Sequence, residues 1–361
     1  MIMDINNLGF AKELSDQMKK TSSGPFIVGR ITQEHRERYI VSTGDQSYEA
    51  EITGNLRFTA RSRSDFPAVG DWVNISIYDK DQAIIHEILP RRSVLERRAA
   101  GNSADTQIIA TNIDVAFIIQ ALNNNFNMNR FERYMSLCYS SHIEPVLVLS
   151  KIDLVSDQEI VDAVSILKKR AGKVRHILLS NTTMEGLSQL MATIEKGMTY
   201  CVVGSSGVGK STLINNLLRK NTLKTGEIST HTNKGRHITE HRELFVLENG
   251  GIIIDTPGMK EVGMTDNPKG ITTAFQEIIK IGRECKFHNC NHINDEGCAV
   301  LEALDKGNID RDSYNNFIKT QKEQARFRTT IAEKRKKEKG FGKMLKNYHK
   351  DINRLNKGMH E

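Results

Sequence analysis

Residues 204–211 form a pattern that binds the phosphates of a nucleotide. Their sequence is Gly-Ser-Ser-Gly-Val-Gly-Lys-Ser, and such glycines let backbone N–H groups close around phosphates at the positive end of the following helix. Lys210 then reaches the β- and γ-phosphates, and Ser211 supplies an oxygen to Mg²⁺. A Gly/Ser-rich turn is the simpler alternative, but the apolar run 198–203 and the helical pattern 211–218 predict the strand, loop and helix that this chemistry needs. The expected nucleotide contacts are Gly204, Ser205, Ser206, Gly207, Val208, Gly209, Lys210, Ser211 and Thr212.

A carboxylate suited to magnesium follows this phosphate loop. The apolar run 251–254 ends in Asp255-Thr256-Pro257-Gly258. A carboxylate at the end of a buried strand beside a phosphate loop holds Mg²⁺ through water, and Gly258 lets its N–H approach the γ-phosphate. Alone this would be a common turn, but downstream of a phosphate loop it predicts the second half of the metal site.

A segment that reads guanine precedes the phosphate loop. Ser150, Lys151, Ile152 and Asp153 close a predicted strand over residues 145–149. An aspartate accepts two hydrogen bonds from the N1–H and 2-amino groups of guanine, and adenine offers no such pair. Lys-x-Asp is common on surfaces, so this prediction depends on the phosphate loop nearby. A second predicted strand, 174–179, ends at Ser180 and Asn181, where we expect another loop that contacts the base.

The order of these segments indicates a cyclic rearrangement, because ordinary GTPases carry the base reader downstream of the phosphate loop. Nearly the whole chain resembles the ribosome-small-subunit-dependent GTPase family (RsgA, also called YjeQ). The resemblance includes this order of segments, the segment Gly235 to His241 and a Cys/His cluster beyond it. The chain departs from that family at Ser150, where Asn or Thr is usual, and at Asn181, where Ala is common. Ile238 and Glu240 also interrupt a segment that is typically richer in threonine. The resemblance implies a GTPase that acts in late maturation of the small ribosomal subunit, with ribosome-stimulated turnover.

The hydrolytic step needs a residue that orients the attacking water. Met259 follows Gly258, where Ras-type enzymes have a glutamine. His237 and His241 are the nearest polar candidates, and the resemblance favours His237. With Lys210 and His237, the resemblance implies a catalytic role for Thr239, which would also bind Mg²⁺ together with Ser211 and Asp255.

Three cysteines and a histidine have the spacing of a zinc site, Cys285-x₄-Cys290-x-His292-x₅-Cys298. Soft ligands clustered in this way favour one tetrahedral zinc over a reduced loop or disulfides. His288 is an alternative histidine, and the resemblance selects His292. The other two cysteines, Cys138 and Cys201, fall in apolar segments and are expected to be buried thiols.

The N-terminal region predicts a small antiparallel barrel. Short alternating runs separated by glycine and polar residues recur between residues 25 and 95, which suits a five-stranded OB-fold that binds RNA. The only tryptophan, Trp72, is expected in the core rather than as a platform for bases. Candidates for phosphate contacts are Arg57, Arg61, Arg63, Arg91, Arg92, Arg97 and Arg98.

Basic charge is concentrated at the C-terminus. Residues 320–361 contain 13 Lys and Arg against 5 Asp and Glu, a net charge of +8, whereas the whole chain has +7. A solvated helix face explains such a run, but beside a zinc module and an OB-fold we expect the segment 334–343 to neutralise RNA phosphates.

We therefore expect a multidomain α/β protein of 361 residues. Its predicted parts are an N-terminal OB-fold β-barrel (1–98), a circularly permuted P-loop GTPase domain (99–275) and a C-terminal zinc-binding helical domain (276–361). No signal peptide or membrane span is supported, so we expect a cytoplasmic monomer that binds Mg²⁺ with GTP and contacts ribosomal RNA. The rival functions are a P-loop enzyme with another substrate and a non-enzymatic RNA-binding scaffold with a nucleotide-locked core.

Overall fold

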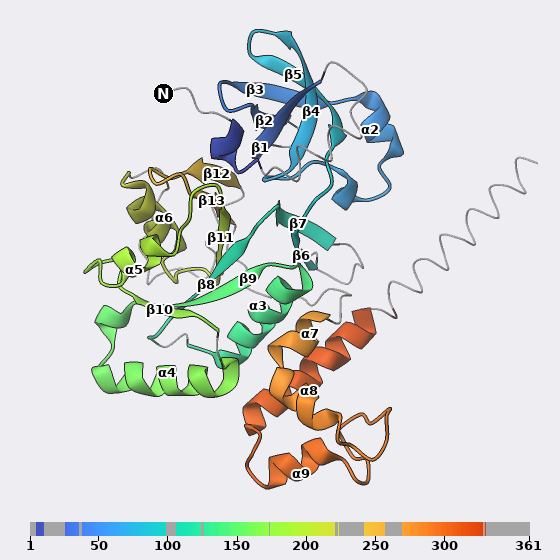
Figure 1. Cartoon of the computed structure of the whole chain (residues 1–361), viewed down its shortest axis with the longest axis vertical. Helices are drawn as coiled ribbons and strands as arrows, with labels where there is room; N and C mark the ends of the chain where they lie inside the picture. Colours follow the sequence, from blue (N-terminus) through green and yellow to red (C-terminus); the bar gives the residue numbers. More distant parts are fainter. Residues whose placement is uncertain are drawn as a thin grey trace, which may run out of the picture.

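The computed structural model places three parts along its longest axis (Figure 1). A β-barrel and a bundle of short helices lie at opposite ends of a mostly parallel sheet covered by helices. None of the helices among the described residues has the length and apolar character needed to cross a bilayer. The structure describes residues 5–10, 26–35, 38–98, 106–123, 126–172, 174–220, 223, 242–256, 269–327 and 329.

The N-terminal barrel confirms the five predicted strands. Their hydrogen-bonded order is β1-β2-β3-β5-β4, and the pairing of β1 with β4 closes the barrel. β3 and β5 are parallel and the other pairs antiparallel, as in an OB-fold. Trp72 is fully buried, as expected, beneath the short 3-10 helix η1. The elements are η1 (Ile5–Leu8), β1 (Ile27–His35), β2 (Arg38–Ser42), β3 (Ser47–Ile52), α2 (Gly54–Thr59), η2 (Arg63–Asp65), β4 (Trp72–Asp79) and β5 (Gln82–Ile88).

Two connections join the barrel to the central sheet. β6 (Val94–Arg98) and β7 (Thr106–Thr111) form an antiparallel hairpin, so the boundary proposed after residue 98 falls inside a paired unit. β1 also touches the edge strand β12 (Glu243–Val246) through the Gln33–Glu243 bridge, where the side chains hydrogen-bond at 2.5 Å. Packing across these connections makes the interior of barrel and sheet continuous.

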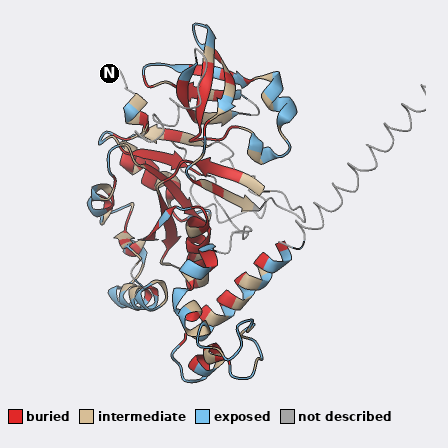
Figure 2. Ribbon diagram, turned by 45° about the vertical axis from the view of Figure 1, so that its right-hand side comes forward, coloured by how far each residue is buried: buried red, intermediate tan, exposed pale blue. Residues whose placement is uncertain are grey.

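The central sheet holds the predicted nucleotide-binding strands in the order β10-β9-β8-β11-β13-β12. The first five are parallel, and successive residues alternate between two buried layers, which is why these strands are nearly continuous apolar runs. Figure 2 shows these strands buried, whereas the helix α4 (Asp157–Ala171) exposes most of its residues. The strands are β8 (Val115–Ala121), β9 (Glu144–Ser150), β10 (His176–Leu179), β11 (Thr199–Gly204) and β13 (Ile252–Asp255).

Helices cover both faces of this sheet. α3 (Met128–Ser140) and α4 (Asp157–Ala171) pack in the apolar layer on one face, which continues into the barrel. α5 (Leu187–Ala192) and α6 (Lys210–Leu218) pack in the apolar layer on the other face. Cys138 on α3 and Cys201 on β11 are buried free thiols in the first layer, as expected. A parallel sheet with helices on both faces brings the loops after its strands to one edge.

The C-terminal helices pack against α3. At Gly270 of α7 (Lys269–Ala274), an added Cβ would lie only 1.9 Å from the carbonyl oxygen of Ser136 on α3, so glycine permits this close approach. Beyond it lie α8 (Gln276–Gly282), α9 (Ala299–Asp305) and a helical segment over residues 311–327, which share a small apolar core. The basic segment 334–343 lies outside the described residues.

Candidate functional site

The phosphate loop lies at the carboxyl end of the central strand β11. Its glycines are required by close approaches: an added Cβ at Gly204 would lie 2.4 Å from the carbonyl oxygen of Ile119, and one at Gly209 would lie 2.7 Å from Asn181 Nδ2. Gly207 and Gly209 have φ values of 80° and 97°, which only glycine adopts readily. Ser211 and Thr212 occupy the first turn of α6, so the predicted loop is formed at a helix N-terminus.

Lys210 and Asp255 bury opposite charges beside the phosphate loop. Lys210 Nζ donates hydrogen bonds to the carbonyl oxygens of Gly204 (3.1 Å) and Ser205 (2.9 Å). Burial lowers the pKa of Lys210 to about 8 and raises that of Asp255 to about 6, and each charge partly opposes the shift of the other. Both charges are costly to bury, and the phosphates and magnesium of a nucleotide would stabilise them.

The segment predicted to read guanine reaches the phosphate loop from a neighbouring strand. Ser150, at the end of β9, is fully buried and donates a hydrogen bond from Oγ to the carbonyl oxygen of Val208 at 2.8 Å. Lys151 has a left-handed backbone, with φ of 59°, and begins the 3-10 turn η3 (Ile152–Leu154). Ile152 is buried and Asp153 is exposed, so the carboxylate is accessible to a base.

The second predicted base loop also contacts the phosphate loop. Asn181 Nδ2 donates to the carbonyl oxygen of Gly209 at 3.0 Å, and Asn216 Nδ2 on α6 donates to the carbonyl oxygen of Asn181 at 3.2 Å. Ser180 Oγ accepts hydrogen bonds from the N–H groups of Thr182 (3.2 Å) and Thr183 (3.1 Å), which shapes the loop. Asn181 therefore ties the two loops together, a role that alanine cannot take. No local sequence pattern selects Asn216, because its importance depends on this tertiary contact.

The predicted catalytic residues His237 and Thr239 and the glycine Gly258 lie outside the described residues. Their expected roles therefore stay predictions. The residues that the structure does bring together are the phosphate loop, both base loops and Asp255, which follow four different strands. Such a pocket can bind a nucleotide and a metal at the carboxyl edge of the sheet.

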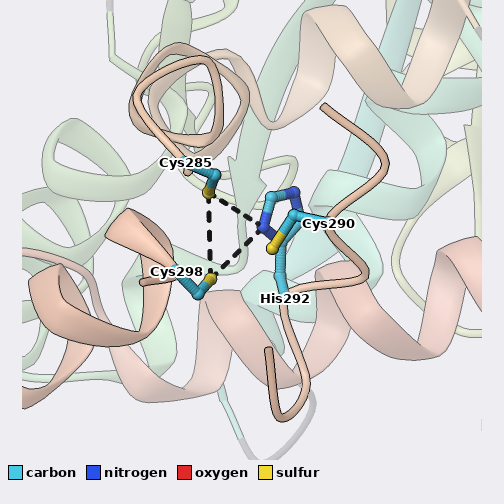
Figure 3. A group of neighbouring side chains, drawn as sticks. All are labelled: Cys285, Cys290, His292 and Cys298. Atoms are coloured by element: carbon cyan, nitrogen blue, oxygen red, sulfur yellow. Dashed lines mark hydrogen bonds between the residues drawn. The ribbon is translucent and has the colours of Figure 1, made fainter. Parts of the chain in front are cut away.

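The predicted metal ligands converge in the C-terminal helical part. Figure 3 shows the side chains of Cys285, Cys290, His292 and Cys298 pointing toward one another, and their ligand atoms all lie within 4.8 Å of each other. His292 Nδ1 lies 3.6 Å from Cys285 Sγ and 3.5 Å from Cys298 Sγ, and the two sulfurs are 3.9 Å apart. These spacings fit a zinc tetrahedron, whose S–S edge is about 3.8 Å for Zn–S bonds of about 2.3 Å.

Neighbouring residues hold the histidine in place. Tyr314 Oη donates to the carbonyl oxygen of His292 at 2.6 Å. Gly282 leaves room for the ring, because an added Cβ would lie 3.2 Å from His292 Cε1 and Nε2. His292 itself has a left-handed φ of 59°. The geometry thus favours His292 over His288, and the four ligands and their surroundings fit one structural zinc ion.

Three of the arginines proposed for phosphate contacts have structural partners instead. Arg91 forms a 2.7 Å ion pair with the buried Asp71 and also donates to the carbonyl oxygens of Ser64 and Phe66. Arg92 pairs with Asp114 at 3.1 Å, and Arg97 donates to Gln107. The exposed arginines around α2 remain candidates: Arg57, Arg61 and Arg63. The side chain of Arg98 lies outside the described residues.

Comparisons with known proteins agree with this geometry. The RsgA GTPase family model matches residues 88–265. The small ribosomal subunit biogenesis GTPase RsgA 1 of Bacteroides thetaiotaomicron is 39% identical over 349 residues, which cover 96% of this chain and 97% of that protein. The small ribosomal subunit biogenesis GTPase RsgA 2 of Lactiplantibacillus plantarum is 40% identical over 321 residues, with 89% and 90% covered.

Two solved structures share the fold. YjeQ from Thermotoga maritima superposes with a TM-score of 0.62 at 22% identity, covering 83% of this chain and 99% of that chain. YloQ, described as a circularly permuted GTPase, gives a TM-score of 0.57 at 20% identity, covering 84% and 97%. They support the permuted strand order and the three-part architecture. The identity to curated relatives over nearly the full length shows that this chain belongs to the RsgA GTPase family.

Proposed function

We propose that this protein hydrolyses GTP to GDP and phosphate while it acts in the biogenesis of the small ribosomal subunit. The observation that carries the proposal is the meeting of the base reader and the phosphate loop, through Ser150 with Val208 and Asn181 with Gly209. A pocket that combines these loops selects guanine and holds a triphosphate. The names of the curated relatives supply the ribosomal role.

The residues of the proposed site divide the tasks of this reaction among them. The N–H groups of the phosphate loop and Lys210 hold the β- and γ-phosphates, and Asp153 accepts hydrogen bonds from guanine. Ser211 and Asp255, with Thr239, would hold Mg²⁺, which neutralises charge on the phosphates when bound. His237 would orient the attacking water, because Met259 has no polar group for that task.

GTP binding would also act as a conformational switch. Residues 256–268 connect Asp255 in the nucleotide pocket to α7, which packs against α3 and leads into the zinc-binding helices. We infer that the γ-phosphate orders Gly258 and the loop around Thr239, which fixes the zinc-binding part relative to the barrel. This state binds the small subunit tightly, and hydrolysis releases it.

Phosphate release over many turnovers, with and without small ribosomal subunits, tests the function. We expect slow release by the protein alone and faster release with subunits. Asp153→Asn should shift the preference from GTP to xanthosine triphosphate, because the amide pairs with a 2-oxo group rather than the 2-amino group of guanine. Absence of hydrolysis under both conditions, with tight GTP binding, would favour the rival RNA-binding scaffold.

Binding to the subunit tests the switch separately. A non-hydrolysable GTP analogue should increase co-sedimentation with small subunits over GDP, and equal binding with both nucleotides would remove the switch from the proposal.

We further propose that the protein is a monomer and that it works in the cytoplasm, where ribosomal subunits are assembled. The domain limits proposed above remain 1–98, 99–275 and 276–361, with the β6–β7 hairpin spanning the first boundary.

A further inference from the structure

Helix α3 brings a second cation to the phosphate loop. Arg130 Nη1 donates a hydrogen bond to Ser205 Oγ at 3.5 Å. Lys210 Nζ donates to the carbonyl oxygen of the same serine at 2.9 Å. Two cations from different helices therefore meet at Ser205, the second residue of the loop. Such convergence is expected where a polyanion binds, since the two cations otherwise repel each other.

The position of Arg130 in its helix is electrostatically unfavourable. Asn127 caps α3 by accepting a hydrogen bond from the N–H of Arg130 at 3.1 Å, so Arg130 lies in the first turn. The N-terminal end of a helix is positive, so its first turn favours acidic residues and disfavours cations. The first turn of α3 nevertheless contains Arg130 and no acidic residue. A local rule broken in this way is typical of a functional residue.

The rest of α3 is held firmly, so Arg130 is presented from a rigid element. Its neighbour Phe131 is fully buried, and Glu132 is buried in an ion pair with Arg170 of α4 at 2.8 Å. Arg133 pairs with Glu323 of the C-terminal helical segment at 2.8 Å. Catalytic groups perform best when neighbouring contacts fix their position.

A second cation at the γ-phosphate would accelerate the reaction. The chain has Met259 where Ras-type enzymes have a water-orienting glutamine, and an arginine that neutralises developing phosphoryl charge is among the strongest contributions to GTP hydrolysis. We propose that Arg130 is a catalytic residue that binds the γ-phosphoryl oxygens in the transition state, an inference that rests on the proposed GTPase function.

In that step the water oxygen forms a bond to the γ-phosphorus while the bond from the γ-phosphorus to the β,γ-bridging oxygen breaks. The electron pair of the broken bond leaves with GDP. One water hydrogen stays on the attacking oxygen and the other is transferred to a phosphoryl oxygen, so both end on inorganic phosphate. Arg130 stabilises the charge on the transferring oxygens from outside the loop, in addition to the contribution of Lys210. It takes no proton, because its guanidinium stays charged throughout.

Single-turnover GTP hydrolysis by Arg130→Ala, Arg130→Gln and Arg130→Lys tests the proposal in the full-length protein. We expect Arg130→Ala and Arg130→Gln to slow hydrolysis by about 10²-fold or more while GDP affinity stays within about threefold. Arg130→Lys should recover part of the rate because it restores the charge but not the planar fork. Binding of GDP with aluminium fluoride, which mimics the transferring phosphoryl group, should be lost in parallel with the rate.

Arg219→Ala serves as the matched control. Arg219 caps α6 and forms an exposed pair with Glu248, so its loss should leave hydrolysis unchanged. The proposal is overturned if Arg130→Gln hydrolyses GTP within twofold of the wild type, or if GDP affinity falls as much as the rate, which would indicate a structural role. A wild-type protein that hydrolyses no GTP would instead remove the proposed function, so the two failures are distinguishable.

Discussion

Ser150 Oγ donates a hydrogen bond to the carbonyl oxygen of Val208 at 2.8 Å, although the two residues are 58 positions apart. Both are buried, and the contact joins the base reader after β9 to the phosphate loop after β11. Parallel strands bring their carboxyl ends to the same edge whatever their order along the chain. The cyclic rearrangement therefore preserves the nucleotide site, because the site depends on which strands are neighbours in the sheet and not on the order of the strands along the chain.

Replacing Ser150 with alanine should weaken this junction. The Val208 carbonyl would lose a buried partner, which costs about 1–3 kcal/mol, and part of that cost should appear as reduced affinity for GDP. Fluorescent GDP titration and thermal unfolding measure the two effects. Ser165→Ala, on the exposed face of α4, is the control and should change neither. Unaltered GDP affinity and stability in Ser150→Ala would show that the hydrogen bond does not support the site.

Local sequence patterns were sufficient to predict the elements but not the contacts between them. The buried strands and the phosphate loop were predictable because apolar runs followed by special turn residues specify them. The contacts of Asn181 were not predictable, because they depend on where α6 and the phosphate loop lie in space. The ion pair of Arg91 was not predictable for the same reason, since its partner Asp71 lies 20 residues away. Long polar side chains have many possible partners, and only the fold selects one.

The pKa of Lys210 predicts how nucleotide binding varies with pH. Its pKa is about 8 in the nucleotide-free protein, and bound phosphates should raise it because they stabilise the ammonium. The contribution of Lys210 to affinity should therefore be constant below about pH 8 and fall by up to tenfold per pH unit above it, because binding then requires uptake of a proton. Calorimetry of GDP binding in buffers of different ionisation enthalpy measures that proton.

The exposed residue Lys306 provides a control for this pH dependence. Lys306→Met removes an ion pair with Glu302 on the surface of the C-terminal part, and it should leave the profile unchanged. Absence of proton uptake above pH 8 in the wild type would contradict a pKa of about 8 for Lys210.

Removing the zinc ligands should unfold the C-terminal helices without abolishing nucleotide binding. Cys285, Cys290 and Cys298 belong to the small core shared by α8 and α9, and a structural zinc supplies much of the folding free energy of such a part. Cys285→Ser should reduce bound zinc from one equivalent to none and expose residues 276–305 to proteases. Metal analysis and limited proteolysis measure both effects. Cys138→Ala, which changes a buried thiol outside the cluster, is the control and should retain one zinc. If Cys285→Ser also retained one zinc, the cluster would not be the zinc site.

The buried Glu132 should be essential for attaching the C-terminal helices to the GTPase domain. Its carboxylate accepts hydrogen bonds from Arg170 of α4 (2.8 and 3.0 Å), and from Ser313 (3.0 Å) and Asn316 (2.6 Å) of the C-terminal helical segment. Glu132→Ala leaves the Arg170 cation buried without its main partner, so we expect a loss of about 3–5 kcal/mol in the free energy of unfolding. Denaturant unfolding measures this loss. The exposed pair removed by Lys306→Met should cost at most about 0.5 kcal/mol, and a similarly small effect of Glu132→Ala would mean that the buried network does not hold the two parts together.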